Sequence, residues 1–331
     1  MSRVAVLPGL DPATYQRHAL HADDQVWVEK NCYIDIWIET VHALGLDPTA
    51  MLGFTVALDF EGDQWTFFKP PHGELYELYG VDVQELNVWR PLLDEAVEHL
   101  GAGKLISTEA DAWWLPDTAG TDYRTQHTKT TIVLQDLDVE ARRLGYFHNA
   151  SYHQLEGEDF VETFRVGKPY DPAYMPLFAE LVRIDRVVRR SPAELGALAR
   201  GYLRRHLARR PVDNPVPRFA ARFARDLGWL HEQGLAFYHA WAFATVRQLG
   251  AAFELAAAHL RWLGGSGAAG CDGLEPAAEA FTAISTGCKA FILKAARAVN
   301  GKRALDATPM MDELAGAWQR GIDTLVARLD G

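Results

Sequence analysis

"TKTTIVLQDLDVEARRLGYFHNA", residues 128–150, decides how the first half of this chain folds. Two runs rich in β-branched and aromatic residues, 128–137 and 142–150, meet at the short connection "DLDVEA". A connection this short favours an antiparallel hairpin, because parallel strands need a long crossover. Similar runs at 54–60 and 104–115 predict further strands, so we expect an antiparallel sheet.

A helix precedes this sheet. "YIDIWIETVHALGL" (33–46) has apolar residues at helical spacing and closes at Gly45, and 73–80 and 90–103 predict two more helices. From about residue 172 the strand signal vanishes. Helices are predicted over 173–190, 191–210, 222–264, 276–301 and 310–329. We therefore expect an α+β chain, with a sheet domain over 1–165, an all-α half over 166–331 and a hinge at 167–176.

The composition is that of a globular protein. The chain has 331 residues, of which 48% are hydrophobic and 23% charged, and no apolar run approaches the roughly 20 residues of a membrane span. The N-terminus has no apolar signal-peptide core. The three cysteines, Cys32, Cys271 and Cys288, argue against a disulfide framework and for a reducing cytoplasm.

Charge is distributed unevenly along the chain. The formal net charge of −11 argues against general nucleic-acid binding, yet residues 183–225 contain twelve arginines and three acids. This segment is either a docking face for an anionic partner or a set of solvated helix faces. The candidate docking arginines are Arg183, Arg186, Arg189, Arg190, Arg204, Arg205, Arg209 and Arg210.

Cys32 stands at the predicted start of a helix, one residue after Asn31, a favourable N-cap type. Unsatisfied N–H groups of a first helical turn stabilise a thiolate, which is the nucleophilic form of cysteine. The alternative is a small buried hydrophobe, the usual role of a lone cysteine. The position predicts a nucleophile only if a histidine base lies nearby.

His127 and Asn149 are the candidate partners. His127 stands at the start of the second predicted strand and Asn149 at the end of the next, so antiparallel pairing predicts that they are neighbours. A catalytic cysteine needs a histidine base, and that histidine needs an orienting acceptor. His148 is a rival for either role, but strand alternation puts it on the opposite face from Asn149.

Other chemistries have weaker signals. His18 and His21 have no third metal ligand nearby. Asp59, Glu61 and Asp63 could suit Ca²⁺ or Mg²⁺, but they fit the solvated end of a strand better. The glycine-rich stretch 264–273 lacks the Gly-Lys-Ser/Thr of a phosphate loop. We expect no metal and no tightly bound cofactor.

Five stretches carry a family resemblance: "NCYIDIWIE", "TVALDFEGDQWTFFK", "YGVDVQELNVWR", "DAWWLPDTAGTDYRTQHTKTT" and "RLGYFHNASYHQLEGEDF". They resemble the papain-like cysteine transferases, in particular the butirosin-type acyltransferases, which move aminoacyl groups off carrier proteins. The chain is also similar to a bacterial family met near amino acid:carrier protein ligases. The resemblance is dense over roughly residues 30–160 and looser over the helical half.

The resemblance implies a papain-like fold and a Cys32–His127–Asn149 triad acting on a thioester. The donor would be an acyl or aminoacyl group on the phosphopantetheine arm of an acyl carrier protein, and the acceptor a small molecule or peptide, as in natural product biosynthesis. Peptidases of this fold carry an oxyanion-hole glutamine six residues before the cysteine. Here that position is Val26 and Gln25 is one residue earlier, so Asn31 or a backbone N–H is the alternative donor.

The segment "DAWWLPDTAGTDYRTQH" then forms the expected substrate wall, through Asp111, Trp113, Asp117 and Tyr123. An acid there would bind the α-ammonium of an aminoacyl group, whereas the tryptophans alone would equally serve as core. Two other functions stay open. One is a papain-like peptidase, amidase or thioester hydrolase, in which water completes the turnover. The other is a non-catalytic binding protein with Cys32 in its core.

Overall fold

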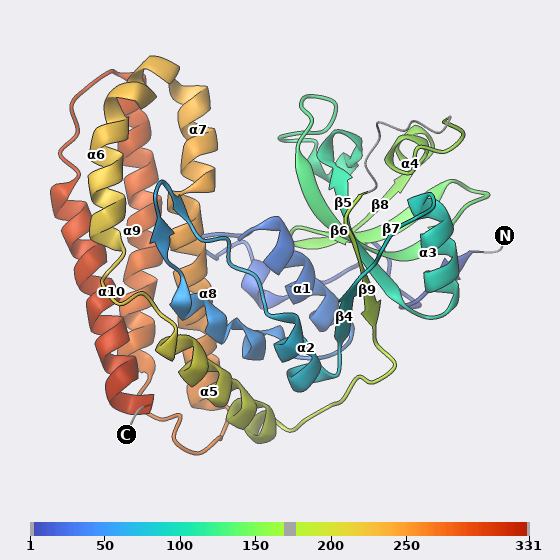
Figure 1. Cartoon of the computed structure of the whole chain (residues 1–331), viewed down its shortest axis with the longest axis horizontal. Coiled ribbons are helices and arrows are strands. Elements are labelled where there is room, and N and C mark those ends of the chain that lie inside the picture. Colours follow the sequence, from blue (N-terminus) through green and yellow to red (C-terminus); the bar gives the residue numbers. More distant parts are fainter. Residues whose placement is uncertain (1–2, 169–176, 330–331) are drawn as a thin grey trace. The chain divides into compact units, whose positions relative to one another are not determined.

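The computed structural model describes residues 3–168 and 177–329, and these fall into two compact units (Figure 1). The sheet unit comprises the chain up to Ala22, Asn31–Pro48 and Pro71–Arg189. The helical unit comprises Asp23–Lys30, Thr49–Pro70 and the chain from Arg190 onward. The fold class is α+β, as predicted, with an antiparallel sheet in the first half and an all-helical second half.

The sheet has the strand order β4-β9-β5-β6-β7-β8, with β1 added beside β6, and every neighbouring pair is antiparallel. The predicted hairpin is confirmed, because β6 and β7 pair Asp138 with Arg143 across a tight turn. The strands are β1 Val4–Ala5, β4 Asp82–Glu85, β5 Leu105–Asp111, β6 Lys129–Asp138, β7 Arg143–His148, β8 Ser151–Glu156 and β9 Ala179–Arg183.

Helices cover both faces of this sheet (Figure 1). Helix α1 packs on β6, β7 and β8, whereas α3 packs on β5 and β6 from the other side, over a core that includes Ile106, Ile132 and Leu144. The helical elements of this unit are α1 Cys32–Ala43, α2 His72–Tyr79, α3 Leu92–Gly101, α4 Glu158–Thr163 and the short 3₁₀ turns η1 Ala19–His21, η3 Ala112–Trp114 and η4 Pro116–Thr118.

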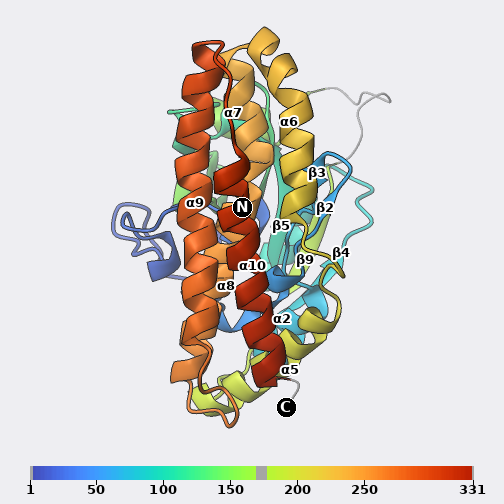
Figure 2. The same ribbon diagram turned by 90° about the vertical axis from the view of Figure 1, so that its left-hand side faces the viewer.

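Long helices form the core of the helical unit, and Figure 2 shows several of them running side by side. Apolar residues at helical spacing are buried on the inner faces of α8, α9 and α10. The elements are α5 Pro192–Ala208, α6 Val216–Gln233, α7 Leu235–Ala244, α8 Val246–Gly265, α9 Glu275–Asn300 and α10 Thr308–Leu329, with the 3₁₀ segment η2 Pro48–Ala57 and the hairpin β2 Phe60–Glu61, β3 Gln64–Trp65.

Residues Asp23–Lys30 form a strap that docks on α8 and α9 of the helical unit. The Trp27 indole donates to Ser285 Oγ at 3.1 Å and fits above Gly250, where a Cβ would lie 2.7 Å from the ring. Glu254 accepts the Val26 N–H at 2.8 Å and lies 3.0 Å from the ammonium of the fully buried Lys30. The strap is therefore held by both packing and charge.

Three element predictions are corrected by the structure. The helix expected over 222–264 is divided among α6, α7 and α8, with breaks at Gly234 and Thr245. Residues 54–60, predicted as a strand from their β-branched and aromatic residues, lie mostly in η2, where burial rather than strand pairing accommodates them. The predicted helix 173–190 contains β9, which pairs with both β4 and β5. The sheet unit therefore continues past the expected boundary at 165, while residues 169–176 of the expected hinge lie outside the described residues.

Candidate functional site

Cys32 is the first residue of α1, as predicted, and Asn31 caps the helix. The Asn31 side-chain oxygen accepts the N–H groups of Tyr33 at 3.0 Å and Ile34 at 2.9 Å. Within the described chain no acceptor lies on the Cys32 N–H, so it is the donor left open at this helix start. The side-chain carbonyl of Asn31 is therefore used by the helix cap, and the Cys32 N–H stays open at the helix start.

Helix α1 is buried along almost its whole length. Its nine residues from Tyr33 to Val41 are all buried, whereas Cys32 is partly exposed and its thiol is free. Cys271 and Cys288 are buried, and burial raises the pKa of the Cys288 thiol far above its usual value. Of the three cysteines, Cys32 is thus the one that a reagent from solvent can reach.

His127 is held by Asp111 and Trp113. Its Nδ1 lies 2.6 Å from Oδ2 of Asp111, and its ring stacks on Trp113 with centroids 4.5 Å apart and planes 12° from parallel. The His127 side chain is 67% exposed, so Nε2 faces solvent. A carboxylate on one ring nitrogen and an open second nitrogen is the arrangement of a general base.

This His127–Asp111 pair lies on the face of the sheet that carries α1. Tyr33 of α1 reaches down to Glu180, and Ser107 of β5 donates to the same carboxylate. Because side chains alternate along a strand, Asp111 lies on the same face of β5 as Ser107. Cys32 and His127 therefore belong to one side of the sheet, although no hydrogen bond joins them within the described residues.

Asn149 does not orient His127. It is the first residue of the two-residue turn between β7 and β8, with a φ of 45°, a conformation that asparagine tolerates. The register that pairs Val133 with Phe147 carries Asn149 to the level of Thr131 rather than His127. Asp111, expected in the substrate wall, takes the orienting position that the sequence assigned to Asn149.

Asp117 and His148 lie on the opposite face of the sheet. Oδ2 of Asp117 lies 2.6 Å from Nδ1 of His148, whose Nε2 lies 2.8 Å from the Thr130 hydroxyl, and Tyr146 donates to the other carboxylate oxygen. Burial acts to raise the pKa of Asp117, but the hydrogen bonds from His148 and Tyr146 outweigh it and lower that pKa. Asp117 is therefore committed inside the protein and is not free to bind a substrate.

Of the other residues expected in the substrate wall, Trp113 contacts His127 and Tyr123 does not. Trp113 stands beside His127, as described above, but the Tyr123 hydroxyl donates to Asp159 at 3.0 Å and so ties the loop to α4. Gln25, the other oxyanion candidate, belongs to the strap of the helical unit. Of the predicted substrate residues, Asp111 and Trp113 are the two that meet His127.

A second histidine that contacts α1 was not predicted from the sequence. His72, at the start of α2, places Nε2 at 2.7 Å from the Tyr33 hydroxyl and 3.4 Å from Oε1 of Glu180. Burial and then the Glu180 charge raise the pKa of Tyr33. The segment around Glu180 was predicted as helix, so nothing in the sequence pattern linked His72 to residue 33.

Another polar cluster is fully buried beneath α1. His21 lies between two carboxylates of this helix, with Nδ1 at 2.5 Å from Glu39 and Nε2 at 3.1 Å from Asp35, while Tyr15 donates to Glu39 at 2.6 Å. Burial acts to lower the pKa of His21, but the hydrogen bonds to Asp35 and Glu39 outweigh it and raise that pKa. This cluster fastens the N-terminal segment to the helix that bears Cys32.

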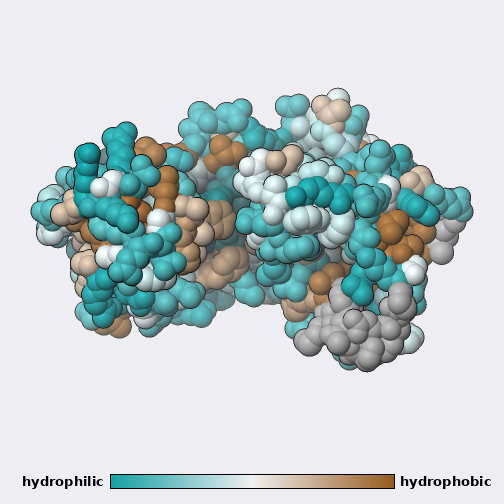
Figure 3. Space-filling view, turned by 90° about the horizontal axis from the view of Figure 1, so that it is seen from above, coloured by the Kyte–Doolittle hydropathy of each residue, from teal (hydrophilic) through white to brown (hydrophobic). Residues whose placement is uncertain are grey.

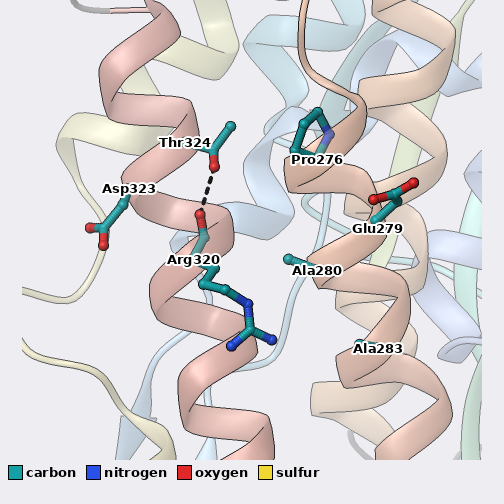
Figure 4. A pocket seen from close by; sticks show the side chains of 7 residues that line it. All are labelled: Pro276, Glu279, Ala280, Ala283, Arg320, Asp323 and Thr324. Carbon is teal, nitrogen blue, oxygen red and sulfur yellow. Dashed lines mark hydrogen bonds between the residues drawn. The ribbon is translucent and has the colours of Figure 1, made fainter.

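Two cavities lie away from these groups. A groove of about 590 Å³ between α9 and α10 is lined by Ala280 on one side and by Arg320 on the other, with the guanidinium extending into the gap (Figure 4). A polar pocket of about 380 Å³ in the sheet unit is bordered by Arg3 and Tyr152. Neither is lined by Cys32 or His127.

The chain matches two family models along most of its length. The DUF1839 N-terminal domain matches residues 16–184 and the DUF1839 C-terminal domain matches residues 193–327. The chain belongs to the DUF1839 family. Both family domains meet between β9 and α5, which agrees with the extent of the sheet in the structure. No curated protein matches the chain.

In this DUF1839 chain, the described residues contain no group of three or more His, Cys, Asp or Glu side chains arranged to hold a metal ion. Among the helices that the structure describes, none has the length and apolar character needed to cross a membrane.

Proposed function

We propose that this DUF1839 protein is a cysteine-dependent acyltransferase with a papain-like arrangement. The observation that supports this most is α1, a buried helix whose first residue is a solvent-accessible cysteine thiol. An antiparallel sheet beneath the helix, and a His127–Asp111 pair on the same sheet face, agree with the residue types that such chemistry needs.

The first half-reaction forms a thioester on the protein. His127 Nε2 takes the proton of the Cys32 thiol, and the thiolate attacks the thioester carbonyl of an acyl or aminoacyl group on a phosphopantetheine arm. The Cys32 N–H donates to the oxyanion, a contribution of about 3 kcal/mol. The carbon–sulfur bond to the arm breaks, and the leaving thiol takes a proton from Nε2 of His127. Asp111 holds the other ring nitrogen and stabilises the imidazolium.

The second half-reaction releases the product. An acceptor amine or hydroxyl attacks the Cys32 thioester while Nε2 of His127 takes its proton, and Cys32 leaves as the thiolate. One acyl group has then moved from sulfur to nitrogen or oxygen, with no redox change and no cofactor beyond the arm of the donor. If water replaces the acceptor, the same groups give a thioester hydrolase or amidase.

The donor is proposed to be an acyl carrier protein, docking through arginines. Carrier proteins are acidic, so charge complementarity would steer their encounter. The candidate arginines are not all available: Arg183 pairs with Asp82 at 3.2 Å, and Arg189 donates to the carbonyl of Gly45 at 2.9 Å. On α5 and the residues just after it, Arg204, Arg205 and Arg209 are exposed and make no ion pair in the described chain.

The deciding experiment is intact mass spectrometry after mixing the protein with a panel of aminoacyl-pantetheine thioesters. We expect a mass increment equal to the acyl group on the wild type and on Cys271→Ala, and none on Cys32→Ala. Release of free acid without a lasting increment would identify a hydrolase. An increment that survives in Cys32→Ala, or the absence of both increment and thioester loss, would leave the non-catalytic binding function in its place.

Two histidine variants test which base acts. His127→Gln should slow acylation of Cys32 by about 100-fold or more, because a positioned base contributes at least that much. His72→Gln is the matched comparison, since His72 contacts the neighbouring Tyr33. A large loss in His72→Gln together with normal rates in His127→Gln would transfer the role of the base to His72.

A further inference from the structure

The polar pocket of about 380 Å³ in the sheet unit has no part in the proposed acyl transfer. It lies beside β1, where a bulge in β6 shifts the register between Leu134 and Asp136. β-Bulges redirect side chains and recur next to active sites. Hydrophilic residues cover most of the surface drawn in Figure 3, so a polar lining alone would not distinguish a pocket. This pocket differs because part of its polar lining is buried.

The bulge directs two consecutive polar side chains toward the hydroxyl of Tyr152. The Gln135 amide nitrogen donates to this hydroxyl at 2.6 Å, and Asp136 lies opposite Gly145. A Cβ on Gly145 would lie 2.0 Å from the Tyr152 hydroxyl and 3.0 Å from Cβ of Asp136, so the glycine makes room for both side chains. All three polar residues are buried. Buried polar groups need hydrogen-bond partners, so their unused capacity indicates what the pocket can bind.

The Tyr152 hydroxyl has a proton that a bound group can accept. The side-chain oxygen of Gln135 accepts the Leu7 N–H at 3.0 Å, which fixes the amide with its nitrogen toward Tyr152. The hydroxyl is therefore the acceptor in that contact, and the described residues provide no acceptor for its own proton. Tyr152 is 2% exposed and lines the pocket, so the pocket is where an acceptor can reach this proton.

The other polar groups of the lining supply both donors and acceptors. Arg3 donates to Asp136 through Nε, at 2.8 Å, and through Nη2, which leaves Nη1 as a donor. The Gln154 side chain is exposed and makes no hydrogen bond within the described chain. Asp11 accepts the Ala13 N–H with Oδ1 at 2.9 Å and keeps Oδ2 as an acceptor.

The charges of the lining disfavour an anion. Arg3 contributes +1, and Asp11 and Asp136 contribute −1 each, so the formal charge of the lining is −1. The guanidinium is already neutralised by the Asp136 carboxylate. Leu10 and Pro12 add apolar surface to the lining. A ligand that suits this set is uncharged, carries groups that both donate and accept, and has carbon atoms to place against the apolar residues.

We propose that this pocket binds a small neutral polyhydroxy compound of the size of a monosaccharide or cyclitol. Hydroxyl groups of the ligand accept the proton of Tyr152 and the N–H groups of Arg3 and Gln154. Another hydroxyl donates to Asp11, and the ring carbons lie against the apolar part of the lining. The volume of about 380 Å³ falls at the lower end of the range for small-molecule sites, as a ligand of this size requires.

A structural role explains only part of this network. The contacts of Arg3 and Leu7 with β6 hold the N-terminal strand on the sheet. That role uses neither the proton of Tyr152 nor the side chain of Gln154. The inference concerns this pocket alone and does not depend on the proposed acyl transfer.

Saturation-transfer difference NMR of the full chain with glucose, galactose, myo-inositol and sorbitol, each at up to about 20 mM, tests the proposal. We expect saturation transfer to at least one of them, with a dissociation constant of about 1–5 mM, as is usual for about twelve heavy atoms. Gln154→Ala and Tyr152→Phe should each raise this constant about 5-fold or more, because each removes a hydrogen bond to the ligand. Gln84→Ala, at an exposed glutamine of β4, is the matched control and should bind as the wild type.

Gln154→Ala changes an exposed side chain, so it still tests the site should Tyr152→Phe fail to fold by circular dichroism. No saturation transfer to any of the four compounds would overturn the proposal. So would binding that both variants leave unchanged, because the site would then lie elsewhere. Stronger transfer to acetate or lactate than to the polyols would also overturn it, because the ligand would then be an anion.

Discussion

Removal of the buried ion pair between Lys30 and Glu254 should destabilise the helical unit in a way that depends on which partner is lost. Lys30 is fully buried and its ammonium lies 3.0 Å from Glu254, which also accepts the N–H groups of Val26 and Trp27. In Lys30→Met the carboxylate keeps both N–H donors, so we expect a cost of about 3 kcal/mol, at the low end for a broken buried pair.

The reverse variant should cost more. Glu254→Gln removes the negative charge beside the fully buried ammonium of Lys30, which also donates to the Trp27 carbonyl, and we expect a cost of about 4–5 kcal/mol. The double variant Lys30→Met/Glu254→Gln removes both charges and should cost only about 1–2 kcal/mol. The two sites would then be coupled by several kcal/mol.

Urea unfolding followed by ellipticity at 222 nm measures these differences, since the helical unit supplies most of the helix. Because chains with more than one compact unit often depart from two-state unfolding, the midpoint of the helical transition should be compared between variants rather than a single global free energy. Ala327→Glu, at an exposed alanine of α10, serves as a surface control. Additive costs of less than about 1 kcal/mol for each single variant would refute the reasoning.

Three further outcomes are expected. Because the pKa of His21 is raised in the folded chain, its contribution to stability is complete below about pH 6.5 and is lost as the pH rises through the raised pKa. In thermal melts between pH 6.5 and 9, His21→Gln should therefore lose less stability than the wild type. A parallel loss of stability in both proteins would contradict this expectation. Gly145→Ala would place a Cβ 2.0 Å from the hydroxyl of the buried Tyr152 and should cost about 1–3 kcal/mol in urea titrations, and an unchanged midpoint would contradict the expected overpacking. Native labelling with iodoacetamide should modify Cys32 and spare Cys288 until urea is added, as peptide mass mapping would show; early labelling of Cys288 would contradict its burial.

Local signals in the sequence were sufficient to predict where α1 begins. An asparagine followed by a helical apolar pattern fixes both the cap and the position of Cys32, because the hydrogen bonds involved span only two or three residues. The β6–β7 hairpin was equally accessible, since its strands are joined by a short turn. These features depend on neighbours in the chain.

Features that depend on pairing between strands far apart in the sequence could not be predicted. β9 pairs with β4 and β5, which lie far away in the sequence, and its apolar residues alone did not distinguish a buried strand from a helix. The contact between Asp111 and His127 follows from the register of β5 against β6, which pairs Asp111 with Lys129 and so brings it beside His127. Without that register, the expected hairpin pairing favoured Asn149, although Asp111 is nearer to His127 along the chain.

The interleaving of the two units has a consequence for synthesis on the ribosome. The strap Asp23–Lys30 leaves the exit tunnel early, yet its partners Gly250 and Ser285 are made more than two hundred residues later. During that interval the contacts of Trp27 with Ser285 and of Lys30 with Glu254 cannot form, and long-range contacts of this kind slow folding. The nascent chain therefore exposes an apolar, acidic segment next to Cys32 until translation is nearly finished, and exposed apolar segments of this kind are what chaperones bind.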